Sequence, residues 1–409
     1  MKRVVSLIFC TLLTLSAFAQ NGAAMVDAVQ LFADGDVAAA RSAFEKMHAR
    51  DTTDDAVNYY LGLCEYSLGR EATAEQHFLA AMRQDSTNCW YIHALATMYD
   101  AQRRTIEAGT MCEKLVKMKP QHYRNPYTLT TIADAKAGTR QDSLAIKYYQ
   151  EALDLDPEYA PAEIGLAEAM RLRGNYPGYF LSLGRFIEST QVSGKIKSSY
   201  MKTLLDNVDS RFWWVWSEQL GKLVDRCEEM HPDDIQSHVN QIQMCFFKRD
   251  TTAWMNECEK LVPLARAQKD TTNLMLALSV IGDTWHNRGN VRKAYETYDE
   301  ALKVKPDEVS ILNNYAYYLS LEKKKLRKAL KMSRTTIELE PDNATYLDTY
   351  GWILYLLGKP KEAKPHFKRA MIYGGKDSAV VLEHYSIVLD ALGEKDLSTY
   401  YRNLSEQKK

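Results

Sequence analysis

Small and aromatic side chains recur along the chain at fixed offsets. One copy of the series, in chain order, is Gly282, Gly289, Ala294, Tyr298, Ala301 and Pro306. Nearly the same offsets return in two further copies: Gly351, Gly358, Ala363, Phe367 and Ala370, and Gly62, Gly69, Ala74, Phe78 and Ala81. Looser copies lie at 89–120 and 126–157. The period is about 34 residues, which indicates repeated supersecondary units stacked in an array.

Each unit is predicted to be a pair of antiparallel helices. Small residues at its eighth and twentieth positions let the two helix backbones approach closely. An aromatic residue at the twenty-fourth fills the gap to the next pair, and glycine at the fifteenth provides a left-handed turn between the helices. Proline at the thirty-second ends the second helix, as in VKPDE, LEPDN and LDPEY, whose polar residues can cap the next helix.

This pattern resembles the tetratricopeptide repeat family over nearly the whole chain after the first twenty residues. The resemblance implies an all-α, right-handed superhelical solenoid of about eleven helix-turn-helix hairpins, since a single hairpin cannot bury its apolar face and neighbours must stack on it. Units with the pattern start near residues 21, 55, 89, 126, 160, 275, 309 and 344, and degenerate units cover 193–230, 233–268 and 377–407. We therefore expect an N-terminal array at 20–190, divergent hairpins forming a joint at 191–270, and a C-terminal array at 271–409.

Residues 1–19 are predicted to be a secretory signal peptide. Lys2 and Arg3 precede an apolar run at 4–15, and the sequence AFA then supplies a small-residue cleavage pattern. The run is shorter than the roughly 20 residues that span a bilayer, and a bulky residue before Cys10 disfavours a lipoprotein box. We expect export to the periplasm, with an extracellular or envelope-associated location as alternatives, because the leader resembles those of Bacteroidota proteins. No transmembrane segment is expected in the mature chain.

Composition excludes several classes of protein. With 46% hydrophobic residues, 26% charged residues and a formal net charge of -1, the chain has the apolar material of a folded protein and no excess of positive charge for nucleic acid. The cysteines after the leader lack CxxC spacing, which favours buried free thiols over a zinc site or disulfides and leaves any pairing open.

Linear motifs of catalysis and cofactor binding are absent from the sequence. It contains no HExxH, GxGxxG, GxxxxGK[ST] or GxSxG, and no two histidines stand four residues apart on one helix. We therefore expect no enzyme activity, no catalytic residues, no bound metal and no cofactor.

The family resemblance implies a binding groove lined by the first helix of each unit. The family's groove positions carry over to Trp90, His93, Asp100, Asp283, His286, Asn313, Tyr317, Asp348, Trp352 and Tyr355. Some family members clamp a peptide's terminal carboxylate with lysine, arginine and asparagine; here only Asn314 fits that set, so the clamp is not expected. The aromatic and mildly acidic lining favours a peptide or protein segment with basic and apolar side chains.

The sequence RFWWVW at 211–216 begins the predicted second helix of a degenerate unit. A stripe at helical spacing is expected to be buried and consists of Phe212, Trp216, Leu220, Leu223 and Cys227, with Trp213 close to it. Trp214 falls on the polar face and is a candidate exposed aromatic for partner binding. The alternative is broad burial of this helix where the array bends, and we favour that interpretation.

A basic stretch, KKKLRKALKMSR, belongs to the second helix of its unit and is predicted to face outward. Its cationic residues are Lys323, Lys324, Lys325, Arg327, Lys328, Lys331 and Arg334. A solvated face is the simpler interpretation, and contact with anionic lipid, wall polymer or an acidic protein is the alternative.

Taken together, the patterns predict a non-enzymatic protein-interaction scaffold of the bacterial periplasm that takes part in envelope assembly. Two alternatives remain: a membrane- or cell-wall-associated adaptor that uses the basic outer face, and an accessory subunit of an envelope enzyme. The sequence identifies neither the partner nor the oligomeric state.

Overall fold

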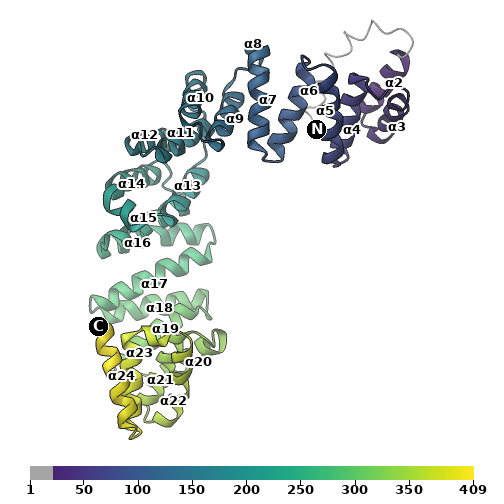
Figure 1. Ribbon diagram of the computed structural model, residues 1–409. Helices are drawn as coiled ribbons and strands as arrows, with labels where there is room; N and C mark the ends of the chain where they lie inside the picture. Colours follow the sequence, from purple (N-terminus) through teal and green to yellow (C-terminus); the bar gives the residue numbers. More distant parts are fainter. Residues whose placement is uncertain (1–21) are drawn as a thin grey trace. The chain divides into compact units, whose positions relative to one another are not determined.

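The computed structural model describes residues 22–409, and every regular element in that range is a helix (Figure 1). The expected all-α class is therefore confirmed. The predicted signal peptide and Cys10 lie outside the described residues. Among the residues that are described, no helix combines the length and the apolar character needed to cross a bilayer.

The chain divides into two compact units, one ending at Ser193 and the other beginning at Gly194. The helices of the first unit are α2 (Gly22–Ala33), α3 (Val37–His48), α4 (Asp55–Ser67), α5 (Glu71–Gln84), α6 (Cys89–Ala101), α7 (Thr105–Met118), α8 (Pro120–Tyr123), α9 (Pro126–Gly138), α10 (Asp142–Leu155), α11 (Ala160–Leu172) and α12 (Tyr176–Glu188). Those of the second unit are α13 (Gly194–Asp206), α14 (Ser210–Met230), α15 (Ile235–Lys248), α16 (Thr251–Ala267), α17 (Thr271–Asn287), α18 (Val291–Val304), α19 (Val309–Leu321), α20 (Leu326–Leu339), α21 (Ala344–Leu356), α22 (Pro360–Ile372), α23 (Ala379–Ala391) and α24 (Lys395–Lys408), with a 3-10 turn, η1 (Gly375–Asp377), before α23.

These helices form eleven successive pairs from α2–α3 to α23–α24, with the short α8 between the third pair and the fourth. The expected number of hairpins, about eleven, is thus confirmed for the described residues. The pair α13–α14 is the loosest, because α13 packs mainly against α15. A separate joint at 191–270 stays a prediction.

In several hairpins the aromatic residue of the repeat packs against a glycine of the same hairpin, whereas the sequence pattern predicts it between one hairpin and the next. The ring of Phe367 on α22 lies so close to Gly351 on α21 that an added Cβ would stand 2.8 Å from it. Phe78 lies against Gly62 in the same way. Tyr149 instead lies against a glycine of the next hairpin, so the aromatic position fills gaps both within and between hairpins.

The turn between the two helices of a hairpin adopts a left-handed backbone conformation. Gly289 and Gly358 have φ of 77° and 76°, a region that costs a residue with a Cβ more than it costs glycine. Where the repeat lacks this glycine, a basic residue takes the same conformation, as at Arg103 and Arg140 with φ of 58° and 60°. The turn geometry is therefore retained without the glycine.

Helix capping after the proline stops is less regular than the sequence suggests. The side chain of Asn343 accepts hydrogen bonds from the backbone N–H groups of Thr345 and Tyr346 at the start of α21. At Glu308 and Tyr159, which precede α19 and α11, the side chain makes no capping hydrogen bond. Only one of the three stop sequences thus places a capping side chain.

Each unit has its own buried core, built from small residues and aromatic rings. Ala294 and Ala363 are fully buried, as are Tyr298 and Phe367. The six described cysteines are buried free thiols, as expected. Burial raises the pKa of the Cys258 thiol to about 12, so it stays protonated near neutral pH and behaves as an apolar group.

Candidate functional site

The first helices of the last four hairpins, α17, α19, α21 and α23, contact one another in order. They carry a set of rings that we call the aromatic row: His286, Tyr317, Tyr318, Trp352, Tyr355 and His384. The ring of His286 stacks on Tyr318 with centroids 3.6 Å apart, and Trp352 stacks on His384 at 4.0 Å and on Tyr355 at 5.1 Å. Rings on α17 and α19 therefore stack on each other, as do rings on α21 and α23.

Asp283 on α17 organises one part of the row. Its carboxylate accepts hydrogen bonds from the hydroxyl groups of Tyr298 and Tyr318, the latter at 3.3 Å. The amide of Asn314 donates to the same carboxylate at 3.1 Å. Burial raises the pKa of Asp283, and these hydrogen bonds only partly oppose that rise. The carboxylate of Asp283 is thus engaged by two tyrosine hydroxyl groups and by the amide of Asn314.

Asp348 on α21 organises the other part of the row. Its carboxylate lies 3.0 Å from Nδ1 of His384 on α23, and both side chains are buried, with 4% and 8% exposed. This contact orients the imidazole ring that stacks on Trp352. Asn313 is buried as well, with 5% exposed. The family-derived expectation that Asn313 and Asp348 line an open groove therefore needs correction, because their side chains lie within the packing between first helices.

The predicted groove residues of the first unit lie on α6. Trp90 and His93 are partly buried and Asp100 is exposed. The ring of His93 lies 5.9 Å from that of Tyr123, and burial lowers the pKa of His93. Asp100 accepts a hydrogen bond of 2.7 Å from the hydroxyl of Tyr127 on α9. These three residues belong to a different unit from the aromatic row.

Two members of the aromatic row, Tyr318 and His384, were not among the predicted site residues. Tyr318 directly follows the predicted Tyr317, so the register of the family's groove positions passes over it. His384 belongs to the terminal pair, whose repeat pattern is too weak to assign groove positions by sequence. The run of aromatic residues in α19 was the available signal for Tyr318.

The aromatic run of α14 is only partly buried. Leu220, Leu223 and Cys227 are buried as predicted, but Phe212 and Trp216 are only partly buried, as is Trp213, whose ring contacts Phe247. Since α14 has 21 residues and the adjacent α15 has 14, part of α14 has less to pack against.

Trp214 is 84% exposed. Broad burial of this helix is therefore not what the structure shows, although binding of a partner by Trp214 stays a prediction.

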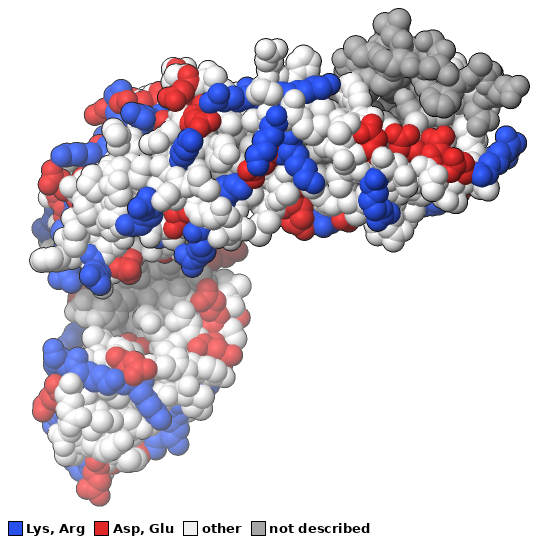
Figure 2. All heavy atoms as spheres, turned by 45° about the horizontal axis from the view of Figure 1, so that its top comes forward, with Lys and Arg blue, Asp and Glu red and all other residues white. Residues whose placement is uncertain are grey.

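All seven cationic residues of the basic stretch are exposed, in the turn before α20 and along that helix. Lys328 contacts Asp299 at 3.3 Å and the hydroxyl of Tyr315 at 2.9 Å, and Lys324 pairs with Glu322 at 3.3 Å. Part of the positive charge is therefore balanced locally. Figure 2 shows basic and acidic side chains interspersed over the face that it draws.

Comparison with known families agrees with this arrangement of paired helices. Models of the tetratricopeptide repeat match residues 248–405, 28–88 and 127–159, which include parts of both units. The chain is a tetratricopeptide repeat protein. Proteins built from this repeat are generally scaffolds that bind other proteins rather than enzymes. No curated protein matches the sequence.

Solved structures similar to this tetratricopeptide repeat protein include the TPR domain of P58(IPK), with 13% sequence identity and a TM-score of 0.31. The match covers 92% of this chain and 99% of the P58(IPK) chain. Another is MamA from Desulfovibrio magneticus RS-1, residues 41 to the end, which is 13% identical with a TM-score of 0.35 and covers 42% of this chain and 94% of that one.

Proposed function

We propose that this protein is a non-enzymatic scaffold that binds a peptide or protein segment along the aromatic row. The observation that carries the proposal is that two stacks of rings, one on α17 and α19 and one on α21 and α23, lie on first helices that contact one another in order. Rings of this kind present a large rigid contact area at little conformational-entropy cost. Buried partners on their inner side, such as Asp348 behind His384, hold them in place before a ligand arrives.

The chemistry of the row suits a segment with basic and apolar side chains. Trp352, Tyr355 and Tyr317 are partly exposed, and their faces can receive a lysine or arginine at about 0.5–1 kcal/mol per contact. The carboxylates of Asp283 and Asp348 lie close behind the rings and add negative potential without a direct contact. An acidic segment would meet neither form of attraction.

We further propose that the scaffold works in the periplasm of a bacterium, in envelope assembly. The composition of residues 1–19 supports export, since two basic residues, a short apolar run and a small-residue cleavage pattern follow one another. Fractionation of cells that produce the chain with a C-terminal tag tests this proposal. Recovery of a shortened chain in the periplasmic fraction is expected, and a full-length chain in the cytoplasm would contradict it.

Replacing Trp352 with alanine tests the binding proposal. The purified protein is titrated with immobilised peptides that are basic and apolar, and with acidic peptides of equal length. The parent is expected to prefer the basic set, and Trp352→Ala to lose most of that preference while far-UV circular dichroism stays unchanged. Ile337→Ala is the matched control, because Ile337 packs on the same core from the second helix α20. Equal loss of binding in both variants would contradict the proposal.

A second candidate function is attachment to an anionic membrane surface through the basic stretch. Its support is the exposure of all seven cationic side chains at one turn and helix. The triple variant Lys323→Gln, Lys325→Gln and Lys331→Gln should then lose salt-sensitive sedimentation with phosphatidylglycerol vesicles. The control neutralises three exposed lysines elsewhere, Lys361, Lys368 and Lys376. Equal sedimentation of both triple variants would rule out this candidate.

A further inference from the structure

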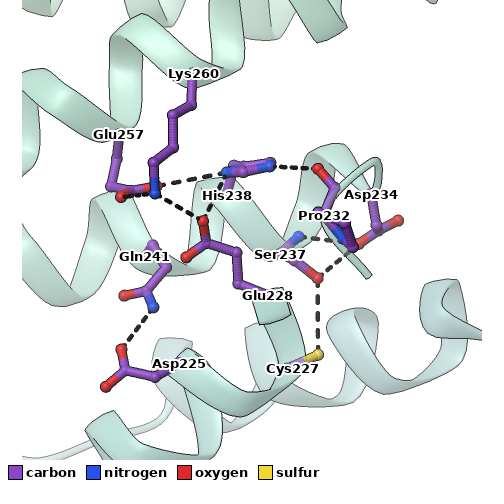
Figure 3. A network of polar contacts seen from close by, with 10 residues as sticks. All are labelled: Asp225, Cys227, Glu228, Pro232, Asp234, Ser237, His238, Gln241, Glu257 and Lys260. Atoms are coloured by element: carbon purple, nitrogen blue, oxygen red, sulfur yellow. Dashed lines mark hydrogen bonds and ion pairs between the residues drawn. The ribbon is translucent and has the colours of Figure 1, made fainter. Parts of the chain in front are cut away.

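Three successive helices of the second unit bring an imidazole and two carboxylates together (Figure 3). Glu228 comes from α14, His238 from α15 and Glu257 from α16. One ligand atom of each lies within 4.8 Å of the other two. None of the three belongs to the aromatic row, and the scaffold function proposed above makes no use of them.

The imidazole of His238 is held in one orientation. Only 3% of the residue is exposed, and Nε2 lies 2.8 Å from the backbone carbonyl oxygen of Pro232. A carbonyl oxygen can only accept, so Nε2 carries the hydrogen. Nδ1 faces Glu228 and Glu257, at 3.4 Å from one oxygen of each, and a metal ion that binds Nδ1 displaces any proton that it carries. One imidazole nitrogen and two carboxylate oxygens thus converge on one point, which is the donor set that a metal cation can use.

Lys260 on α16 supplies the positive charge in the metal-free protein. Its Nζ lies 3.1 Å from Glu228 Oε1 and 2.7 Å from Glu257 Oε1. The lysine side chain is 53% exposed, whereas the two glutamates are only 15% and 13% exposed. Lys260 can therefore turn outward into water, while the three ligand groups stay in place.

Solvent reaches the two glutamates through a cavity of about 480 Å³ between these helices. Glu228, Glu257 and Lys260 are among its lining residues, and the other charged ones are Asp225, Glu229, Lys248 and Asp250. Carboxylates outnumber lysines on this lining, which favours entry of a cation over an anion. The cavity also has room for a water molecule as a further ligand.

We propose that Glu228, His238 and Glu257 form a binding site for one divalent transition-metal ion of the Zn²⁺ type, and that Lys260 leaves the two glutamates when the ion binds. Zinc takes histidine nitrogen and carboxylate oxygen at about 2.0–2.2 Å in a tetrahedron, and two corners of that tetrahedron are about 3.4 Å apart. The two distances from Nδ1 to the carboxylate oxygens have this length.

Two further features fit a transition metal better than Ca²⁺ or Mg²⁺. A nitrogen donor is uncommon around those two ions, which prefer oxygen ligands. The hydrogen bond from Nε2 to the Pro232 carbonyl is the outer contact that commonly fixes a ligating histidine. Bound in this way, the ion joins α14 of one hairpin to α15 and α16 of the next, so it would tie two degenerate repeats together.

Titration of the purified full chain with Zn²⁺ alone, followed by competition with a chromophoric chelator, tests the site. One ion per chain is expected to bind, and Co²⁺ in its place should give the strong visible absorption of a tetrahedral complex. Glu257→Gln and His238→Gln should each weaken binding at least tenfold with circular dichroism unchanged. Binding that survives both substitutions would place the ion elsewhere and overturn the proposal.

Lys260→Met gives the sharper test, because removal of a competing cation should strengthen Zn²⁺ binding several-fold. The matched control is Lys305→Met. Lys305 forms an ion pair with Glu308, and the two residues are three positions apart in the sequence, as Lys260 and Glu257 are. No change is expected in the control. If Lys260→Met binds no Zn²⁺, or binds it more weakly than the parent, the cluster is a closed ion-pair network and the proposal fails.

Discussion

Three glycines of the repeats lie against an aromatic ring sixteen residues further along the chain: Gly62 against Phe78, Gly282 against Tyr298 and Gly351 against Phe367. Each glycine stands inside a helix, where alanine is normally the better helix former by about 0.5–1 kcal/mol. The ring occupies the space that a Cβ would need. Glycine is therefore required at these positions by packing rather than by backbone conformation.

Gly351→Ala is expected to destabilise the protein by about 1–3 kcal/mol, since overpacking against Phe367 outweighs the gain in helix propensity. Gly184→Ala is the control, because nothing lies within 4 Å of a Cβ at that helical position. Denaturation followed by far-UV circular dichroism should show a lower midpoint for the first variant and an unchanged or higher one for the second. A stabilised Gly351→Ala would contradict the packing argument.

Asp283 is a second residue whose surroundings set its behaviour. Burial raises its pKa above the ordinary value of an unfolded aspartate, about 3.9. The folded state consequently holds the proton more tightly than the unfolded chain does. The contribution of this group to stability is then largest at acid pH and falls as pH rises through the folded pKa.

Asp283→Asn removes that pH dependence. Relative to the parent, its free energy of unfolding is expected to increase as the pH rises from about 4 through the raised pKa of the folded state, as measured by urea denaturation at several pH values. Asp270→Asn should show the opposite trend, because hydrogen bonds from the backbone N–H and the side chain of Asn273 lower the pKa of Asp270. Its stabilising charge is present above the unfolded pKa and is lost as pH falls through the folded one. Parallel trends in the two variants would contradict the assignment.

At the scale of the element, the hairpin depends on alanines at the contact between its two helices. Ala294 on α18 and Ala363 on α22 are fully buried, and a larger side chain there would separate the helices. The first helices also carry small residues at this contact, since Gly282 and Gly351 each leave room for one aromatic ring. Each helix of a hairpin thus limits the size of the side chains that the other helix can carry at their contact.

Ala294→Leu and Ala363→Leu should each cost about 1–3 kcal/mol through overpacking. The control is Ala267→Leu, because Ala267 is exposed near the end of α16 and surface substitutions usually stay within about 0.5 kcal/mol. Melting curves of the three variants measure the difference. Identical curves for all three would show that the two alanines are not at a tight helix contact.

At the scale of the whole molecule, the two units each contain buried clusters formed by neighbouring repeats. One cluster of the first unit includes Phe44 and Tyr60, and one of the second includes Phe367 and Tyr385. In an array of this kind, stability is approximately a sum of repeat and nearest-neighbour contributions. A local defect should therefore be felt mainly by the repeats beside it.

Phe44→Ala and Phe367→Ala test this locality, since both rings are fully buried and each substitution should cost about 3–5 kcal/mol. Hydrogen exchange followed by mass spectrometry is expected to show lost protection around α3 and α4 in the first variant and around α21 to α23 in the second. Each variant serves as the control for the other. Loss of protection throughout the chain in either one would indicate a single cooperative unit.

Much of the fold could be predicted because the repeat is defined by residues at fixed, short spacings along the sequence. Helices α6, α9, α11, α19 and α21 begin at the predicted starts of their units. The start of α17 was predicted near residue 275 but lies at Thr271, where Asp270 caps an additional first turn through the backbone N–H of Asn273. The first helix of that unit is longer than the repeat spacing alone suggests.

The candidate sites could be predicted less completely, because their residues depend on contacts between repeats. The family's groove positions led to Trp352 and Tyr355, but the burial of Asp348 depends on His384 in the following hairpin. The exposure of Trp214 likewise depends on the length of the helices that pack beside α14.

The sequence by itself determined the paired helices and their number, because side-chain size at fixed intervals controls how closely two adjacent helices approach. Only the tertiary structure decided that Glu228, His238 and Glu257 meet, since ten and nineteen residues separate them and they occupy three different helices. Spacing along one helix brings groups together over three or four residues. Groups on different helices are brought together by packing, which linear motifs do not encode.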